Sequence, residues 1–198
     1  MSLFTAASLL ESARMVKLAN RQNIYATAKS ILLNASNSTP IEESFDIFLS
    51  HSFLDADIVL GLKKQIEEMG HSVYVDWVTD KELERSEASK ETAALLKKRM
   101  LNSKSLFFAT SSNSGVSKWM PWECGFFDGK KENKVAICPI SLSGTTDTYK
   151  GQEYLALYPY VCKNTFVGGT KEMLWIYETP TKYMIFDAWL NGLQPTQR

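Results

Sequence analysis

The amino-acid sequence predicts an α/β fold built on parallel strands. Short apolar runs of strand length alternate with segments whose apolar residues recur at helical spacing. The strand-like runs are residues 45–50, 71–75, 105–110 and 135–140. Strands that alternate with helices pair in parallel through right-handed crossovers, so their carboxyl ends meet along one edge of the sheet.

Turn and helix signals mark the segments between these strands. Apolar residues keep helical spacing over residues 58–69, and Gly70 is placed to cap the end of that helix. Residues 89–102 predict the next helix, and Pro121 suits the first turn of the one after it. Pro139 in the fourth strand-like run indicates an edge position or a strand end.

A chain of 198 residues suits one domain with an appendage. Residues 1–40 are predicted to be an N-terminal helical extension and linker, and residues 41–198 the main domain with a C-terminal extension. Residues 3–33 contain no proline or glycine, which predicts one helix, or two broken near Asn20. The polar residues 34–40 predict the linker.

The signals weaken beyond residue 141. Residues 166–167 predict a last strand, and Thr179-Pro180 predicts the start of a terminal helix that ends at Gly192.

The composition excludes several classes of partner. Lys+Arg and Asp+Glu number 22 each, so the formal net charge is zero and no basic field favours nucleic acid. No apolar stretch approaches the roughly 20 residues that span a bilayer, and the N-terminal residues lack the pattern of a secretory signal. We therefore expect a cytoplasmic protein without nucleic acid or membrane partners.

The three cysteines contain no C-x-x-C pair, and only two histidines accompany them. This argues against a disulfide framework or a metal site. Cys124 lies near a predicted helix start, where a thiol pKa can be lowered, yet no histidine lies close in sequence to act as its base. A nucleophilic role for Cys124 is therefore disfavoured.

Residues 113–128 combine a polar turn with a short helix that places Glu123 one turn after Trp119. Because this helix follows a strand, a carboxylate in its opening turn lies at the carboxyl edge of the sheet, where open α/β sheets bind ligands. The same pattern also fits an exposed glutamate favoured by the helix dipole, beside two packed tryptophans.

Other side chains share this predicted edge: Ser50, His51, Ser52 and Phe53 after the first strand, Asp76 and Trp77 after the second, and Trp119 after the third. Aromatic rings and hydroxyl groups suit a flat heteroaromatic ligand that is joined to a ribose. A buried or capping role fits His51 equally well, and Ser52 suits a helix cap.

A single carboxylate is enough for one reaction of such a ligand. Glycosidases ordinarily use two, because an acid must protonate the departing oxygen. Nicotinamide leaves a positively charged pyridinium as a neutral molecule and needs no acid. One anion that stabilises the oxocarbenium-like transition state can supply most of the effect, with NAD as substrate and no cofactor.

Four segments together resemble a bacterial Toll/interleukin-1 receptor (TIR) domain. They are residues 45–51, 74–76, 102–105 and 117–128, the last reading Ser-Lys-Trp-Met-Pro-Trp-Glu-Cys-Gly-Phe-Phe-Asp. The last segment is most similar to the TIR proteins of Thoeris-type antiphage defence. The resemblance implies a flavodoxin-like TIR fold of five parallel strands with helices on both faces, and NAD cleavage with Glu123 as the catalytic glutamate.

The resemblance implies further roles. Ser50 and His51 would lie beside the nicotinamide ribose, Trp77 would border the pocket, and Trp119 would support Glu123. Residues 76–86 would form the BB loop, which flanks the nucleotide site and mediates stacking of TIR domains, although the glycine common in that loop is missing here. A homo-oligomer is expected, together with a signalling nucleotide that activates a separate effector.

Two alternatives remain open at this point. One is a noncatalytic TIR scaffold, in which the BB loop and the N-terminal helices drive assembly. The other is an enzyme like the nucleoside deoxyribosyltransferases, which have a related sheet and also use a glutamate on an N-glycosidic bond.

Overall fold

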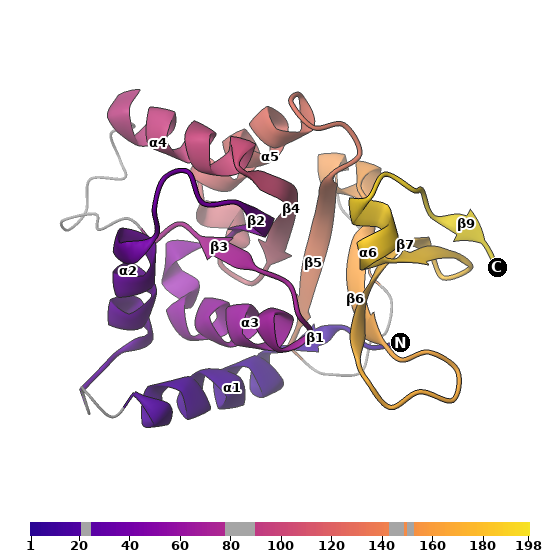
Figure 1. The fold of residues 1–198 in the computed structure, drawn as a ribbon, viewed down its shortest axis with the longest axis horizontal. Helices are drawn as coiled ribbons and strands as arrows, with labels where there is room; N and C mark the ends of the chain where they lie inside the picture. The colour runs from indigo at the N-terminus through magenta and orange to yellow at the C-terminus, as the bar shows by residue number, and fades with distance from the viewer. Residues whose placement is uncertain (21–24, 78–89, 143–148, 150–152) are drawn as a thin grey trace.

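The computed structural model describes residues 1–20, 25–77, 90–142, 149 and 153–198, and a mostly parallel sheet forms its centre (Figure 1). Five strands run parallel in the order β3-β2-β4-β5-β6. They are β2 (Phe45–Ser50), β3 (Val73–Val75), β4 (Ser103–Thr110), β5 (Val135–Ser141) and β6 (Tyr160–Asn164). This is the order of a flavodoxin-like sheet, so the predicted fold class is confirmed.

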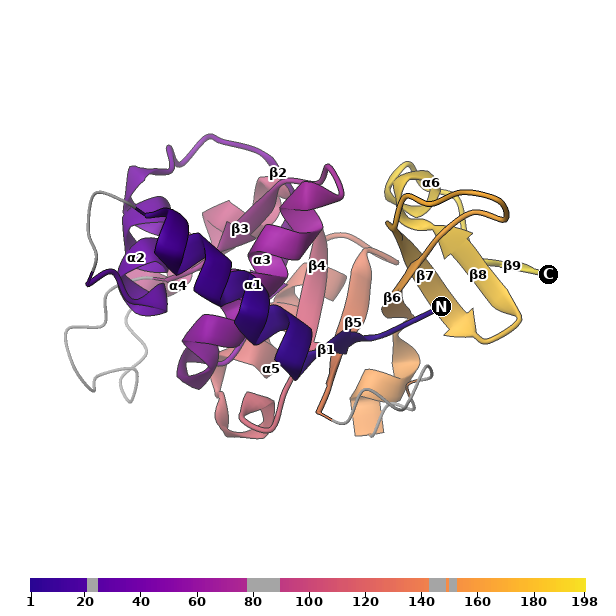
Figure 2. The same cartoon turned by 90° about the horizontal axis from the view of Figure 1, so that it is seen from below.

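Helices cover both faces of this sheet (Figures 1 and 2). One face carries α1 (Ala6–Ala19), α2 (Ala28–Ser38), α3 (Ala56–Glu68) and α6 (Phe186–Leu190), and the other carries α4 (Lys90–Leu101) and α5 (Trp119–Asp128). Successive side chains of a strand point to opposite faces. Ile47 and Leu49 accordingly enter the first core, and Phe48 enters the second.

The helix that follows β2 ends as predicted. Gly70 adopts φ 100°, a left-handed conformation that glycine reaches without steric cost and that commonly closes a helix. Strand β3 then begins at Val73, two residues later than the predicted start.

The first forty residues differ from the prediction in two places. Phe4 and Thr5 form a short strand, β1 (Phe4–Thr5), which pairs in parallel with Ile140 and Ser141 at the end of β5. Helix α2 continues to Ser38, so the predicted linker at residues 34–40 is wrong over most of its length. Its polar residues are compatible with a helix because the buried positions are Leu32 and Ser36, four residues apart on one face.

Helix α1 packs closely on α3 at a glycine. A Cβ atom added to Gly61 would lie 1.9 Å from the backbone oxygen of Leu9 and 2.9 Å from its Cα. Leu9 and Ala13 of α1 are fully buried in the core that α3 shares with the sheet. The absent side chain of Gly61 therefore permits the close approach of the two helices.

Three antiparallel strands extend the sheet beyond β6, and the sequence did not predict them. They are β7 (Met173–Thr179), β8 (Lys182–Ile185) and β9 (Thr196–Gln197). Thr179 and Pro180 stand at the turn between β7 and β8, so the prediction of a helix start there is wrong. The terminal helix is only the five-residue α6, which is followed by Gly192 at φ 99°.

Two further predictions concern single strands. Residues 166–167 lie in the exposed connection between β6 and β7, so the prediction of a strand there is wrong. Strand β5 lies between β4 and β6, and Pro139 pairs with Thr110 where the ladder to β4 ends. Strand β5 continues beyond Pro139 to Ser141, so the interpretations of Pro139 as an edge position and as a strand end are both wrong.

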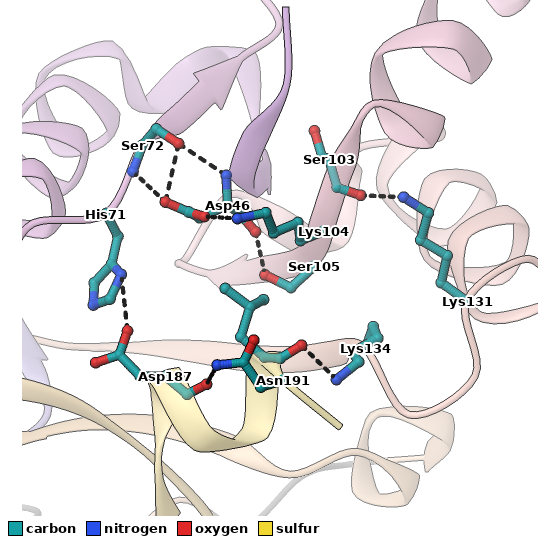
Figure 3. A network of polar contacts seen from close by, with 11 residues as sticks. Asp46, His71, Ser72, Ser103, Lys104, Ser105, Lys131, Lys134, Asp187 and Asn191 are labelled. Atoms are coloured by element: carbon teal, nitrogen blue, oxygen red, sulfur yellow. Dashed lines mark hydrogen bonds and ion pairs between the residues drawn. The ribbon is translucent and has the colours of Figure 1, made fainter. Parts of the chain in front are cut away.

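A polar network lies at the amino ends of the strands, opposite the predicted site (Figure 3). Asp46 on β2 accepts hydrogen bonds from the backbone nitrogen of Ser72 at 2.9 Å and from Lys104 Nζ at 2.8 Å. Burial alone would raise the pKa of Asp46, but the hydrogen bonds from Lys104 and Ser72 hold it below its ordinary value. The carboxylate thus connects β2 to β4 and to the residue before β3.

His71 contacts the terminal helix beside this network (Figure 3). Its ring meets Phe186 edge to face at a centroid distance of 4.8 Å, and its Nδ1 lies 3.8 Å from Asp187 Oδ1. Burial lowers the pKa of His71, and the charges of Asp187 and Asp46 offset this only in part. The folded protein therefore binds this proton less tightly than the unfolded chain does.

We predict that His71 makes stability depend on pH. The free energy of unfolding should have its full value above about pH 6.5, the ordinary histidine pKa. It should decrease as the pH falls below that value, because the unfolded chain then binds the proton more tightly than the folded protein does. Between about pH 7.5 and about pH 5.5, Tm measured by circular dichroism should drop by a few °C in the wild type and by less in His71→Phe. Equal drops in the two proteins would contradict this role.

Candidate active site

Glu123 lies inside the protein at the carboxyl edge of the sheet. It follows Trp119 by one turn of α5 as predicted, although it lies in the second turn of the helix and not in the opening turn. Its exposed fraction is 6%, so the alternative of an exposed glutamate is wrong. Ser50, the last residue of β2, is 1% exposed and donates a hydrogen bond from Oγ to Glu123 Oε2 at 2.5 Å.

This hydrogen bond crosses the point where the strand order reverses. The chain passes from β2 to β3 on one side and later returns to β4 on the other side of β2. In open α/β sheets, ligands bind in the crevice at such a switch point. The hydrogen bond from Ser50 therefore holds the side chain of Glu123 where a ligand is expected.

Three aromatic side chains predicted at this edge form one stack. Trp77 stacks on His51 at a centroid distance of 5.1 Å and on Phe53 at 4.8 Å. The Nδ1 atom of His51 donates to the backbone oxygen of Leu49 at 2.9 Å. Trp77 is only 2% exposed, so its observed role is to hold the ring of His51 next to Ser50.

Asp76 directly follows β3 and is also buried. Tyr74 donates its hydroxyl proton to Asp76 Oδ1 at 3.2 Å. Burial, together with the charge of Asp76, raises the pKa of Tyr74 to about 12, so the phenol stays protonated and remains a donor. Beyond Trp77, the predicted BB loop at residues 76–86 lies outside the described residues.

The remaining two predicted residues lie near the site in supporting positions. Ser52 Oγ accepts a hydrogen bond from the backbone nitrogen of Leu54 at 3.4 Å and caps the short helix η1 (Phe53–Asp55), as the capping interpretation proposed. Trp119 is half-buried, and its ring packs edge to face on Trp122 at 5.3 Å. Contact of any of these side chains with a ligand stays a prediction.

Cys124, next to Glu123 in the chain, does not have an activated thiol. Burial raises its pKa to about 11, the opposite of the lowering considered from its place near a helix start. Its side chain enters the core between α5 and the sheet. The structure thus agrees with the sequence in disfavouring Cys124 as a nucleophile.

A second polar link between the same two connections was missed by the sequence analysis. Asp55, before α3, accepts hydrogen bonds from Ser111 Oγ at 2.5 Å and from Asn113 Nδ2 at 2.6 Å. Ser111 and Asn113 lie between β4 and η3 (Ser114–Val116), on the chain that leads to α5. Small polar residues in loops carry no periodic signal, so their pairing became visible only in the structure.

In the part of the chain that the structure describes, no group of three or more His, Cys, Asp or Glu side chains is placed to hold a metal ion. None of the described helices is long and apolar enough to cross a bilayer.

Comparison with known proteins gave two informative matches. The chain is 50% identical over 192 residues to a probable 3′ cyclic ADP-D-ribose synthase, ThsB′, of Bacillus cereus strain MSX-D12; the match covers 96% of this chain and 99% of that protein. It is 32% identical over 109 residues to a candidate cyclic ADP-D-ribose synthase, TIR2, of Cytobacillus dafuensis, covering 54% of this chain and 28% of that longer protein. No family model matches the chain.

The first match extends through the N-terminal and C-terminal segments as well as the parallel sheet, because it covers nearly the whole of both chains. The strand order and the placement of Glu123 agree with the fold that the sequence motifs implied. The chain belongs to the Toll/interleukin-1 receptor (TIR) proteins of the Thoeris type.

Proposed function

We propose that this protein cleaves NAD at the bond between nicotinamide and ribose, and closes the remaining ADP-ribose into a cyclic signalling nucleotide for antiphage defence. The observation that carries the proposal is the buried pair of Ser50 and Glu123 at the switch point of the sheet. The names of the two relatives, both cyclic ADP-D-ribose synthases, support the same chemistry.

The reaction needs one anion near the anomeric carbon. As the bond from nicotinamide N1 to ribose C1′ breaks, both electrons leave with the ring, which departs neutral. Positive charge then develops on the ribose, and the carboxylate of Glu123 stabilises it. Because Ser50 and the body of α5 already fix this carboxylate, little reorganisation is needed when the charge appears.

Cyclisation follows when a hydroxyl of the other ribose bonds to C1′ and gives up its proton. Glu123 is placed to accept that proton, directly or through water. The relative from Bacillus cereus is named for a 3′ cyclic product, and identity of 50% over nearly the full length supports the same product class here. The chain itself would then need no cofactor.

The proposal includes the cell compartment, the target of the product and the assembly of the enzyme. Three free, buried cysteines suit the reducing cytoplasm. The product would act on a separate effector protein, and the enzyme would assemble through TIR–TIR contacts. If assembly completes the site, specific activity should rise with enzyme concentration, and equal activity across a wide dilution series would argue against it.

Incubation of the purified protein with NAD tests the function. Nicotinamide release followed by chromatography reports cleavage, and mass spectrometry separates the cyclic product from ADP-ribose, which is heavier by one water. Absence of release at every enzyme concentration would favour the scaffold. Exchange of bases between deoxynucleosides, without NAD cleavage, would favour the transferase.

A further inference from the structure

Asp55 occupies a capping position but does not use its side chain as a cap. It is the N-cap residue of α3, a helix of 13 residues, and its carboxylate makes no hydrogen bond to that helix. An N-cap aspartate usually accepts from a backbone N–H of the first turn, which stabilises the helix. Here both carboxylate oxygens accept instead from Ser111 and Asn113.

The partners of Asp55 are themselves ordered by further hydrogen bonds. Ser111 Oγ accepts from the backbone nitrogen of Asn113 at 3.0 Å, and the backbone oxygen of Ser111 accepts from Ser114 Oγ at 2.9 Å. The segment from Ser111 to Ser114 is therefore one compact turn, and the carboxylate of Asp55 holds it from the opposite connection. We call Asp55, Ser111 and Asn113 the loop clamp.

The loop clamp and the Ser50–Glu123 bond join the same two parts of the chain. Ser50 ends β2 and Asp55 lies between β2 and α3, while their partners lie on the connection from β4 to α5 or on α5 itself. Strands β2 and β4 are neighbours, with Ser50 opposite Phe108. Two links thus join these connections at the switch point of the sheet, and one of them includes Glu123.

We propose that Asp55 is a positioning residue for the reaction assigned above, acting through Ser111 and Asn113 to hold α5 and its Glu123 in register with Ser50. The inference rests on the proposed function, because it concerns the same carboxylate. Without the loop clamp, the chain entering α5 loses one of the links that hold Glu123 in register with Ser50. A displacement of about 1 Å in a reacting geometry can cost about a hundredfold in rate.

Asp55→Ser separates this role from fold stability. Serine is a good N-cap and can restore the missing bond to α3, but it is too short to reach both partners. Asp57→Ser is the matched control, since Asp57 lies in the first turn of the same helix and pairs with Lys17 of α1 at 2.6 Å, away from the loop clamp. An ion pair this exposed contributes little to stability.

The expected result is a kcat for nicotinamide release that falls at least about tenfold in Asp55→Ser, with KM within about threefold and Tm within a few °C of wild type. The share of cyclic product should also fall relative to ADP-ribose, because water reaches the reacting carbon more easily when the segment leading to α5 is less well fixed. Asp57→Ser should keep kcat within about twofold. If Asp55 had a purely structural role, the activity of Asp55→Ser would fall only as far as the fraction of folded protein falls.

Asn113→Ala is a second variant, which removes one partner of Asp55 and leaves Asp55 itself in place. It still tests the proposal if Asp55→Ser folds poorly. It should lower kcat and the cyclic share in the same direction, and the double variant should lose less than the sum of the two single effects. An active wild type with unchanged kcat in both variants would overturn the positioning role alone. A wild type that does not cleave NAD would instead overturn the proposed function, and the positioning role with it.

Discussion

Glu123→Gln should lose nicotinamide release by about a thousandfold or more while keeping its fold. Glutamine has the same shape, and its amide oxygen can still accept the hydrogen bond from Ser50, so the core around α5 is retained. What is lost is the negative charge at the ribose. Removing one stabilising group aimed at a developing charge typically costs about a hundred- to a thousandfold in kcat, and here it is the principal such group.

Two further variants calibrate this result. Glu132→Gln removes an exposed carboxylate from the turn after α5 and should leave the rate unchanged. Ser50→Ala should lower kcat by about tenfold or more, because a hydrogen bond to a charged group contributes roughly 1.5–3 kcal/mol. Full activity of Glu123→Gln, with nicotinamide release measured under the same conditions, would refute the assignment.

Gly61→Ala should be the most destabilising single-methyl change in the N-terminal half. The new Cβ would overlap the backbone of Leu9, and because backbone atoms cannot rotate away, α1 must move off α3. Overpacking of this kind costs about 1–3 kcal/mol, occasionally more. In a protein of this size that lowers Tm by roughly 2–12 °C.

Gly125→Ala is the matched control for this change. Gly125 also lies within a helix, but a Cβ there would meet nothing within 4 Å. Alanine is a better helix former than glycine by up to about 1 kcal/mol, so this variant should be as stable as wild type or more so. If Gly61→Ala melts at the wild-type temperature, this result would contradict the close packing of α1 on α3 at Gly61.

Strands β2 to β5 of the parallel sheet were predictable because they are buried on both faces. Leu49 and Phe107 face one core while Phe48 and Phe108 face the other, and such strands appear in the sequence as unbroken apolar runs. The antiparallel strands were not predictable in the same way. Thr179-Pro180 suits the start of a helix and equally suits a turn. The turn forms because Tyr177 pairs with Tyr183 on the next strand, and local sequence signals do not reveal this pairing.

The candidate site was predictable in its location but not in its internal links. The order of strands places Ser50 and Glu123 at one edge, yet nothing in their spacing of 73 residues indicates a direct hydrogen bond. The loop clamp is similar, since Asp55 has the appearance of an ordinary N-cap in sequence. Polar contacts across a sheet edge depend on the distances between side chains, and the pairing of the strands determines these distances.

The pairing of β1 with β5 has a consequence for the order of folding. Phe4 is synthesised long before its partner Ile140, because the two residues lie far apart in the sequence. Until then the buried side of α1, including Leu9, has only part of its final surroundings. Contacts between such distant positions slow folding and leave apolar surface uncovered in the meantime. The nascent chain therefore exposes apolar surface around Phe4 and α1 to chaperones until β5 has been made.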